Sequence, residues 1–206
     1  MAIDARTAAA VDPGWDALAR AAAGEADAFA LVVERHQERL LRLCERLLGD
    51  LEEARDAAQE VFLKAYRNAA GARPEGQVYT WLYRIAVNHC LNKLRRRKIV
   101  RFLRWETPEE GELPAFDPPD HGADPAAALE ARRRWQATKR AIERLPENQR
   151  VVLILARFEG LPYRQIAQVL GITEGAVESR LVRAMRRIEA AQENEASTVS
   201  RGKRAS

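Results

Sequence analysis

The segment from Thr80 to Lys98 carries polar side chains whose types and spacing suit nucleic-acid binding. Plotted as a helix at about 100° per residue, its polar set falls within an arc of roughly 80°. The set consists of Trp81, Arg84, Asn88, Asn92 and Arg95. An aromatic ring stacks on unpaired bases, amides form hydrogen bonds with base edges, and guanidinium groups pair with phosphates. Taken alone, the same pattern is equally typical of a core tryptophan beside a solvated polar surface.

The other side of this segment is apolar. It gathers Leu82, Tyr83, Ala86, Val87, Cys90, Leu91 and Leu94. We therefore expect one face to pack on a core while the polar face stays accessible. The basic run from Arg95 to Lys98, which includes Arg96, either extends the nucleic-acid surface or is a solvated helix end.

A second candidate for nucleic-acid binding lies between Tyr163 and Val182, where the spacing predicts a helix-turn-helix with a tight turn at Gly171. Its packing positions are Ile166, Leu170, Ile172, Val177 and Leu181. The outer face of the second helix holds Ala176, Ser179, Arg180, Arg183, Arg186 and Arg187. Arginine can bind guanine with two hydrogen bonds, and residues further along the helix meet phosphates. An ordinary amphipathic helix with a solvated face is the alternative, which the clustered arginines and the glycine turn disfavour.

The elements that position these residues are predicted to be helices throughout, because almost no window alternates with a period of two. We expect helices over about 15–23, 27–48, 51–69, 80–98, 126–145, 147–158, 163–170 and 174–191. We expect Gly49 to be the C-cap of the second of these helices and Thr80 to be the N-cap of the fourth. The predicted fold class is all-α.

Composition divides the chain into two small helical domains. Seven basic and no acidic residues lie between Lys93 and Arg104. Between Trp105 and Ala131 there are eight acidic residues and five prolines, and no lysine or arginine. Proline and low apolar content indicate a flexible acidic linker. We predict an N-terminal domain over 1–104, the linker over 105–124, a C-terminal domain over 125–193 and a disordered tail over 194–206.

Several function classes are disfavoured by the same sequence. The two cysteines, Cys44 and Cys90, lie far apart in helical patterns, so neither a disulfide framework nor a zinc site is expected. The start lacks the features of a signal peptide, and there is no apolar stretch of about 18 residues. No nucleophile or histidine constellation suggests catalysis. We expect a cytoplasmic protein without a catalytic centre, metal or cofactor, whose pI of about 9.3 suits an acidic partner.

Three sequence blocks in this order resemble bacterial RNA polymerase sigma factors of the extracytoplasmic-function (ECF, group IV) type. They are Asp56–Tyr66 (DAAQEVFLKAY), Thr80–Asn88 (TWLYRIAVN), and Leu145–Arg150 (LPENQR) followed by the helix-turn-helix. The resemblance covers about 15–191, interrupted by the linker.

The resemblance implies a role for each block. The first block would dock on core RNA polymerase through Asp56, Gln59, Glu60 and Leu63. The second would open and capture the −10 promoter element through Trp81, Arg84, Asn88, Asn92, Arg95 and Arg96. The helix-turn-helix would read the −35 element as duplex through Arg157, Ala176, Ser179, Arg180, Arg183 and Arg187.

The family also implies partners. These are core polymerase, promoter DNA in duplex and single-stranded form, and an anti-sigma factor, with no insertion of this chain into a membrane. The linker would thread through the polymerase cleft. Its negative charges would either keep a flexible tether extended or mimic RNA there. Two other classes stay open: a free-standing helix-turn-helix regulator, and a protein adaptor that would not need the exposed Arg180 and Arg183.

Overall fold

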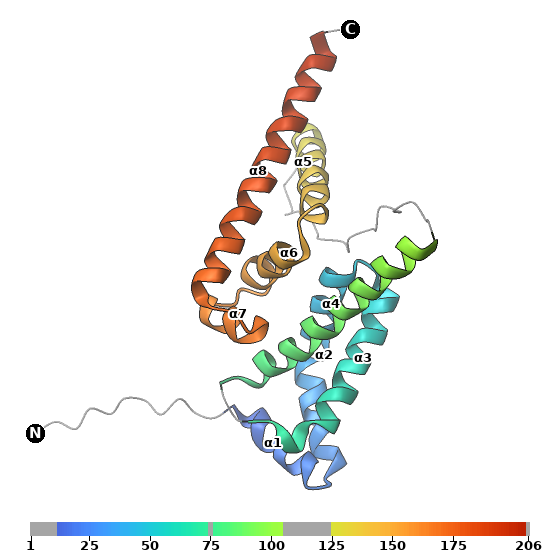
Figure 1. Cartoon of the computed structure of the whole chain (residues 1–206), viewed down its shortest axis with the longest axis vertical. Helices are drawn as coiled ribbons and strands as arrows, with labels where there is room; N and C mark the ends of the chain where they lie inside the picture. The colour runs from blue at the N-terminus through green and yellow to red at the C-terminus, as the bar shows by residue number, and fades with distance from the viewer. Residues whose placement is uncertain (1–11, 74–75, 105–124, 205–206) are drawn as a thin grey trace, which may run out of the picture.

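The computed structural model describes residues 12–73, 76–104 and 125–204, and within these ranges every regular element is helical (Figure 1). This confirms the all-α fold class. The predicted linker over 105–124 lies outside the described residues. Helix α4 ends at Arg104 on one side of it, and helix α5 begins at Pro125 on the other.

The N-terminal domain is built from four helices. They are α1 (Pro13–Ala22), α2 (Ala26–Leu48), α3 (Leu51–Arg67) and α4 (Val78–Arg104), with a short 3-10 turn, η1 (Ala69–Gly71), after α3. Gly49 ends α2 in the left-handed conformation with φ of 83°, as its position in the sequence predicts. Asp50 then begins α3, because its carboxylate accepts the backbone N–H of Glu53 at 2.7 Å.

Helix α2 lies at the centre of this domain and packs against the other three helices. The apolar side of α4 is buried as predicted, with Leu82, Ala86 and Cys90 fully inaccessible. Cys90 meets Cys44 of α2, and their hydrogen bond together with burial raises the pKa of the Cys44 thiol. Cys44 and Cys90 are therefore buried side chains of the core, and Cys44 is held there as the protonated thiol.

The predicted N-cap at Thr80 is wrong. Helix α4 begins two residues earlier at Val78, and Thr80 is buried inside its first turn. The backbone N–H of Val78 donates instead to Asp12 Oδ2 at 3.0 Å, so a residue 66 positions away caps this helix. A remote carboxylate takes the place that the sequence assigns to a local hydroxyl.

The C-terminal domain comprises α5 (Pro125–Glu143), α6 (Glu147–Leu153), η2 (Ile154–Phe158), α7 (Tyr163–Leu170) and α8 (Glu174–Arg204). The sequence predicts one helix over 147–158, but the α-helix ends at Leu153 and a π-helical turn continues to Phe158. Such a turn inserts a residue into the helical repeat and re-aims the side chains that follow. Glu159, which comes directly after this turn, contacts two helices of the N-terminal domain, α2 and α4.

Helices α7 and α8 form the predicted helix-turn-helix. Gly171 adopts φ of 64° between them, a conformation that side chains other than glycine rarely take. The Ile172 N–H donates to the Ala167 carbonyl at 3.1 Å, and the Thr173 hydroxyl accepts the Ala176 N–H at 3.2 Å to cap α8. Ile166, Val177 and Leu181 are buried between the helices, as the pattern predicts.

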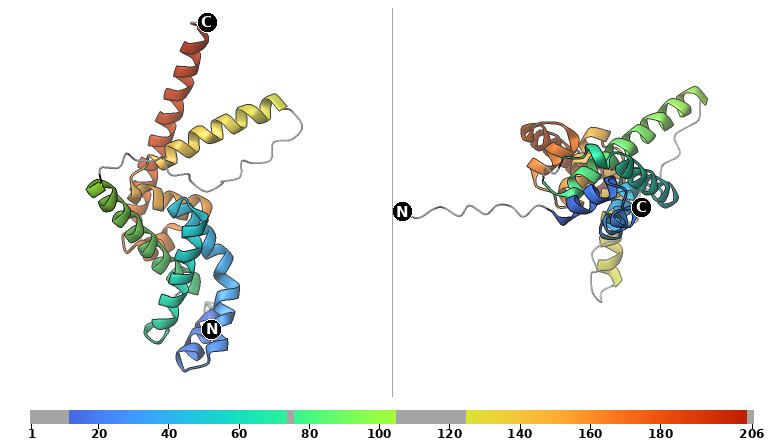
Figure 2. Two further views of the ribbon diagram at one scale, coloured as in Figure 1. Left: turned by 90° about the vertical axis from the view of Figure 1, so that its right-hand side faces the viewer. Right: turned by 90° about the horizontal axis from the view of Figure 1, so that it is seen from below.

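The tail over 194–206 is predicted to be disordered, yet α8 continues to Arg204. Alanine, glutamate and glutamine, which favour helices, fill most of the segment directly after Ile188, and the first glycine in it is Gly202. The far end of α8 projects beyond the rest of the fold (Figures 1 and 2).

The two domains touch each other. Helix α7 packs on α4, and the η2 turn meets α2. Figure 1 shows α7 beside α4, whereas α5 and the far part of α8 point away from the N-terminal domain. The polar surface of one domain is thus placed close to the helix-turn-helix of the other.

Candidate polymerase-binding and nucleic-acid-binding surfaces

Helix α4 presents the predicted polar stripe to solvent. Arg84, Asn88, Asn92, Arg95 and Arg96 are all exposed. The Arg95 guanidinium donates to the Asn92 side-chain oxygen at 3.1 Å, which holds two members of the stripe together. Burial of the opposite face fixes the helix rotation, so these side chains must point outward.

The sequence left open whether Trp81 is a core side chain or an accessible ring for nucleic-acid binding, and the structure shows features of both. It is half-buried, with its ring centroid 6.0 Å from that of buried Trp15 at an interplanar angle of 51°. The Trp15 indole N–H donates to the Gly76 carbonyl at 2.8 Å and ties this pair to the segment before α4. Trp81 is therefore held in one orientation while part of its surface stays accessible.

Helix α3 carries the predicted docking surface. Asp56, Gln59, Glu60 and Leu63 are exposed on one side, and Leu63 keeps 48% of its surface accessible. An apolar side chain within a polar rim is the usual anatomy of a protein-binding patch.

A cleft of about 360 Å³ separates this surface from α4 and is lined by Asp56, Glu60, Lys64, His89 and Arg96, among others. The Lys64 ammonium lies 2.6 Å from His89 Nδ1. Burial, and then the charge of Lys64, lower the pKa of His89. The ring is therefore held neutral, and the cleft separates the acidic docking side of α3 from the basic side of α4.

The outer face of α8 matches the sequence prediction in part. Arg183, Arg187 and, from η2, Arg157 are exposed. Ala176, Ser179 and Arg180 are only partly exposed. The Arg183 guanidinium donates to the Ser179 hydroxyl at 2.7 Å, which orders its fork on the helix surface.

Two family models match the chain, one in each domain. The model "Sigma-70 region 2" matches residues 32–99, and "Sigma-70, region 4" matches residues 135–188. The chain is also 38% identical over 176 residues to the RNA polymerase sigma-H factor of Pseudomonas aeruginosa, covering 82% of this chain and 88% of that protein. It is 34% identical to the ECF RNA polymerase sigma-E factor of Escherichia coli, with 81% and 87% covered. With SigW of Bacillus subtilis the identity is 32%, with 78% and 86% covered.

The chain belongs to the ECF sigma factors of RNA polymerase.

Solved structures share the fold of this sigma factor. CnrH, in complex with the cytosolic domain of CnrY, is 24% identical with a TM-score of 0.61, covering 89% of this chain and 99% of that one. RpoE of Bartonella quintana, in complex with the anti-sigma factor NepR, is 22% identical with a TM-score of 0.62, covering 80% and 96%. In the described part of the sigma factor no helix is long and apolar enough to cross a bilayer, and no three His, Cys, Asp or Glu side chains group as metal ligands would.

Regions 2 and 4 of the sigma factor meet at a cleft of about 540 Å³. Asn88 and Arg95 of α4 line one side, and Arg180 of α8 lines the other. Apolar groups of α4, α6 and the α7–α8 turn complete its walls, among them Leu91 and Ile172. The structure thus brings together side chains that the sequence assigned to two different DNA surfaces.

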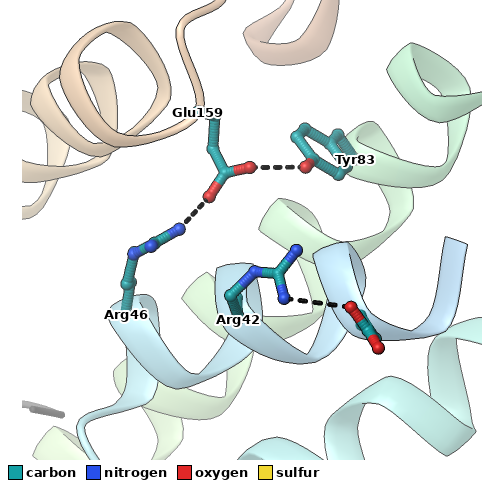
Figure 3. A network of polar contacts seen from close by, with 5 residues as sticks. Arg42, Arg46, Tyr83 and Glu159 are labelled. Carbon is teal, nitrogen blue, oxygen red and sulfur yellow. Dashed lines mark hydrogen bonds and ion pairs between the residues drawn. The ribbon is translucent and has the colours of Figure 1, made fainter.

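Sequence reasoning missed the polar contacts that hold this arrangement. The carboxylate of Glu159 forms an ion pair with Arg46 of α2 and accepts the Tyr83 hydroxyl of α4 at 2.5 Å (Figure 3). Nearby, the hydroxyl of Tyr79, which lies within the first turn of α4, donates to Gln165 Oε1 of α7 at 2.8 Å. No sequence pattern links residues 76 and 113 positions apart, so only the fold reveals these pairs.

Proposed function

We propose that this sigma factor binds core RNA polymerase and directs it to a set of promoters, opening the −10 element with α4 and reading the −35 element with α8. The observation that supports this most is the pairing of two exposed arginine-bearing faces on separate helical domains. One follows α4 from Arg84 to Arg96, and the other follows α8 from Arg183 to Arg187. The polymerase makes the phosphodiester bonds, so the sigma factor itself is not an enzyme.

At the −10 element, α4 is suited to hold bases that have already left the duplex. Trp81 offers a fixed ring for stacking, while Asn88 and Asn92 offer amides to base edges. Opening roughly ten base pairs at ~1.4 kcal/mol per stacking step costs on the order of 14 kcal/mol. A base stacked on an aromatic ring returns ~1–3 kcal/mol. One tryptophan cannot supply the difference, so a large partner that binds and bends the remaining DNA is required.

That partner is core polymerase, and we place its docking site on α3. Leu63 lies exposed among Asp56, Gln59 and Glu60, where burial against a protein would remove an apolar side chain from water. The acidic rim would meet a basic surface. The same placement puts the sigma factor in the cytoplasm, where polymerase and chromosome lie.

At the −35 element, Arg183 and Arg180 project from the first turns of α8, which in a helix-turn-helix enter the major groove. Arg183 can bind guanine in a bidentate manner, and its bond to Ser179 fixes the fork for that purpose. Arg187 lies one turn further along and suits a phosphate, as does Arg157 at the end of η2.

An anti-sigma factor is the expected controller. RpoE of Bartonella quintana, whose two-domain fold this chain shares, was solved in complex with the anti-sigma factor NepR. We infer that a comparable antagonist binds this sigma factor. The acidic linker over 105–124 stays a predicted tether.

Reconstitution with core polymerase on genomic promoter fragments tests the proposal. We expect specific run-off transcripts only when the sigma factor and core polymerase are both present. A free-standing helix-turn-helix regulator would instead bind a duplex operator tightly by itself and yield no transcript. Leu63→Glu provides the matched negative control, because it should abolish transcripts through loss of core binding while leaving the fold intact.

A further inference from the structure

Helix α1 lies outside the segment that the region 2 family model matches. The match begins at residue 32, whereas α1 spans Pro13–Ala22. Even so, α1 is tied to the start of α4, the helix that carries the proposed −10 surface. The N-cap residue of α1, Asp12, accepts the Val78 N–H at 3.0 Å, and a Cβ on Gly14 would lie 3.0 Å from Val78 Cγ2. The first turn of α1 is therefore held tightly against the first turn of α4.

Trp15, in the same turn of α1, packs against the ring that is proposed to stack on bases. The Trp15 and Trp81 ring centroids lie 6.0 Å apart with an interplanar angle of 51°, within the range in which tilted aromatic rings attract each other. Trp15 is only 6% exposed, so its own ring cannot stack on a base. Any effect of Trp15 on DNA must act through the side chains that it touches, and Trp81 is the one that belongs to the −10 surface.

A hydrogen bond fixes the orientation of the Trp15 ring. The indole N–H, which is the only polar group of a tryptophan side chain, donates to the Gly76 carbonyl at 2.8 Å. Gly76 has φ of 73°, a conformation that other residues rarely take, so the place of this acceptor depends on glycine. Because α1 holds its backbone and Gly76 holds its N–H, the Trp15 indole is a rigid support for Trp81.

A ring that is held in advance binds a base more tightly than a ring that rotates. A side chain that is immobilised only on binding loses conformational entropy at that moment, which weakens affinity by about 2- to 10-fold. Trp81 is ordered during folding, since Trp15 packs on it while part of its surface stays accessible. Trp15 should therefore raise the affinity of α4 for an unpaired base without contacting that base.

We propose that Trp15 is a positioning residue for capture of the −10 strand. Its hydrogen bond to Gly76 orients the indole, and the indole fixes the Trp81 ring in the orientation in which an unpaired base stacks on it. The inference rests on the proposed function for the role of Trp81. It adds α1, which lies outside the matched family segment, to the elements that prepare the −10 surface.

The variant Trp15→Phe tests this role, because it removes the indole N–H and leaves an aromatic ring in the core. We expect holoenzyme to bind a single-stranded −10 oligonucleotide, taken from a promoter identified by run-off transcription, about 3- to 10-fold less tightly. The affinities for core polymerase and for a −35 duplex should not change, because they are assigned to α3 and α8. Trp135→Phe makes the same chemical change in α5 and should leave all three affinities unchanged.

A double-mutant cycle separates positioning from general destabilisation. Trp81→Ala should weaken oligonucleotide binding about 5- to 100-fold through loss of stacking. When Trp15→Phe is added to Trp81→Ala, the affinity should fall by less than about 2-fold further, because the ring that Trp15 orients is absent. Circular dichroism and core binding check that region 2 is folded. If Trp15→Phe unfolds, Trp15→Met, which fills the same site without an N–H, is taken through the same cycle.

Each outcome decides the inference, and the cycle shows whether the proposed function fails with it. Equal losses from Trp15→Phe with and without Trp81 would overturn the positioning role and leave the −10 assignment intact, as would unchanged affinity in Trp15→Phe while Trp81→Ala weakens binding. If Trp81→Ala itself had no effect, the stacking role within the proposed function would be wrong and the inference would fall with it. A loss in Trp15→Phe that disappears without Trp81 supports both.

Discussion

Asp12 Oδ2 accepts the backbone N–H of Val78 at 3.0 Å, while its Oδ1 accepts the N–H of Gly14 at 2.9 Å. A single carboxylate thus caps the first and the fourth helix and sets the start of the helix that carries the polar stripe. The two segments approach closely here, because a Cβ on Gly14 would lie 3.0 Å from Val78 Cγ2. The position of the polar stripe on α4 therefore depends on Asp12, a residue that lies 66 positions earlier in the sequence than the start of this helix.

Asp12→Ala should destabilise region 2. Two buried backbone N–H groups lose their acceptor, and a lost cap costs about 0.5–2 kcal/mol each. We expect the free energy of unfolding in urea to fall by about 1–3 kcal/mol. Asp16→Ala, on the exposed side of α1, is the control and should change it much less. Equal effects of the two changes would contradict the double cap.

Leu63→Ala should weaken binding to core polymerase without affecting the fold. Leu63 is largely exposed, so its truncation should alter the free energy of unfolding by no more than about 0.5 kcal/mol. If its side chain is buried at the centre of an interface, the affinity for core polymerase should fall at least ~10-fold in a competition assay. Leu51→Ala, in the first turn of the same helix and similarly exposed, should leave the affinity unchanged.

Arg183→Ala and Arg187→Ala should affect DNA binding differently: the first should change the sequence preference, and the second should weaken binding to all sequences. Removal of a bidentate contact to guanine costs about 1–3 kcal/mol and relaxes the preference at one base pair. Loss of a phosphate contact weakens all sequences alike and reduces the salt slope by about one. Titrations of holoenzyme on −35 duplexes with single base changes, at several salt concentrations, distinguish the two. If Arg183→Ala lowered affinity equally for every base change, its assignment to a base would be wrong.

Asn88→Ala should impair capture of the −10 strand. Asn88 is exposed on α4, so the fold should tolerate the change. We expect holoenzyme to bind a single-stranded −10 oligonucleotide about 5- to 50-fold less tightly, as for the loss of one or two hydrogen bonds. Gln37→Ala removes an exposed amide from α2 and should have no effect. A fork-junction duplex with the strand already open provides the sharpest assay.

Stability should fall in mild acid because of His36. Burial lowers the pKa of His36, and the charges of Arg35 and Arg39 add to this against the opposing charge of Asp12. The unfolded chain therefore takes up a proton first as pH drops below about 6.5, so the native state loses stability from there through the native pKa. The pKa of His89 is also lowered, so protonation of His89 should likewise reduce the stability of the native state as pH falls.

Melting temperatures measured between about pH 7.5 and 5.5 check the role of His36. They should decline less steeply for His36→Gln than for wild type, because the variant has no imidazole to protonate at this position. Identical slopes would remove His36 as the cause.

The local spacing of apolar residues was sufficient to predict most of the helices and the face of each helix that is buried. The period of apolar residues predicted the inward Leu82 and Cys90 and the outward Asn88, because a helix on a core has only one favourable rotation. It also predicted the turn at Gly171, since the left-handed backbone there strongly favours glycine. Boundaries were less predictable where a distant group decided them, as Asp12 does for α4.

The sequence by itself determined the two helical domains, the motifs that resemble ECF sigma factors, and the residues that could meet DNA or polymerase. These depend on local periodicity and residue chemistry, which neighbours along the chain define. Only the tertiary structure decided that Trp81 is braced by Trp15, that Glu159 joins Arg46 to Tyr83, and that Arg180 faces Asn88 across a cleft. Such pairings follow from how whole helices pack, and a contact between residues far apart in sequence leaves no periodic signal in either segment.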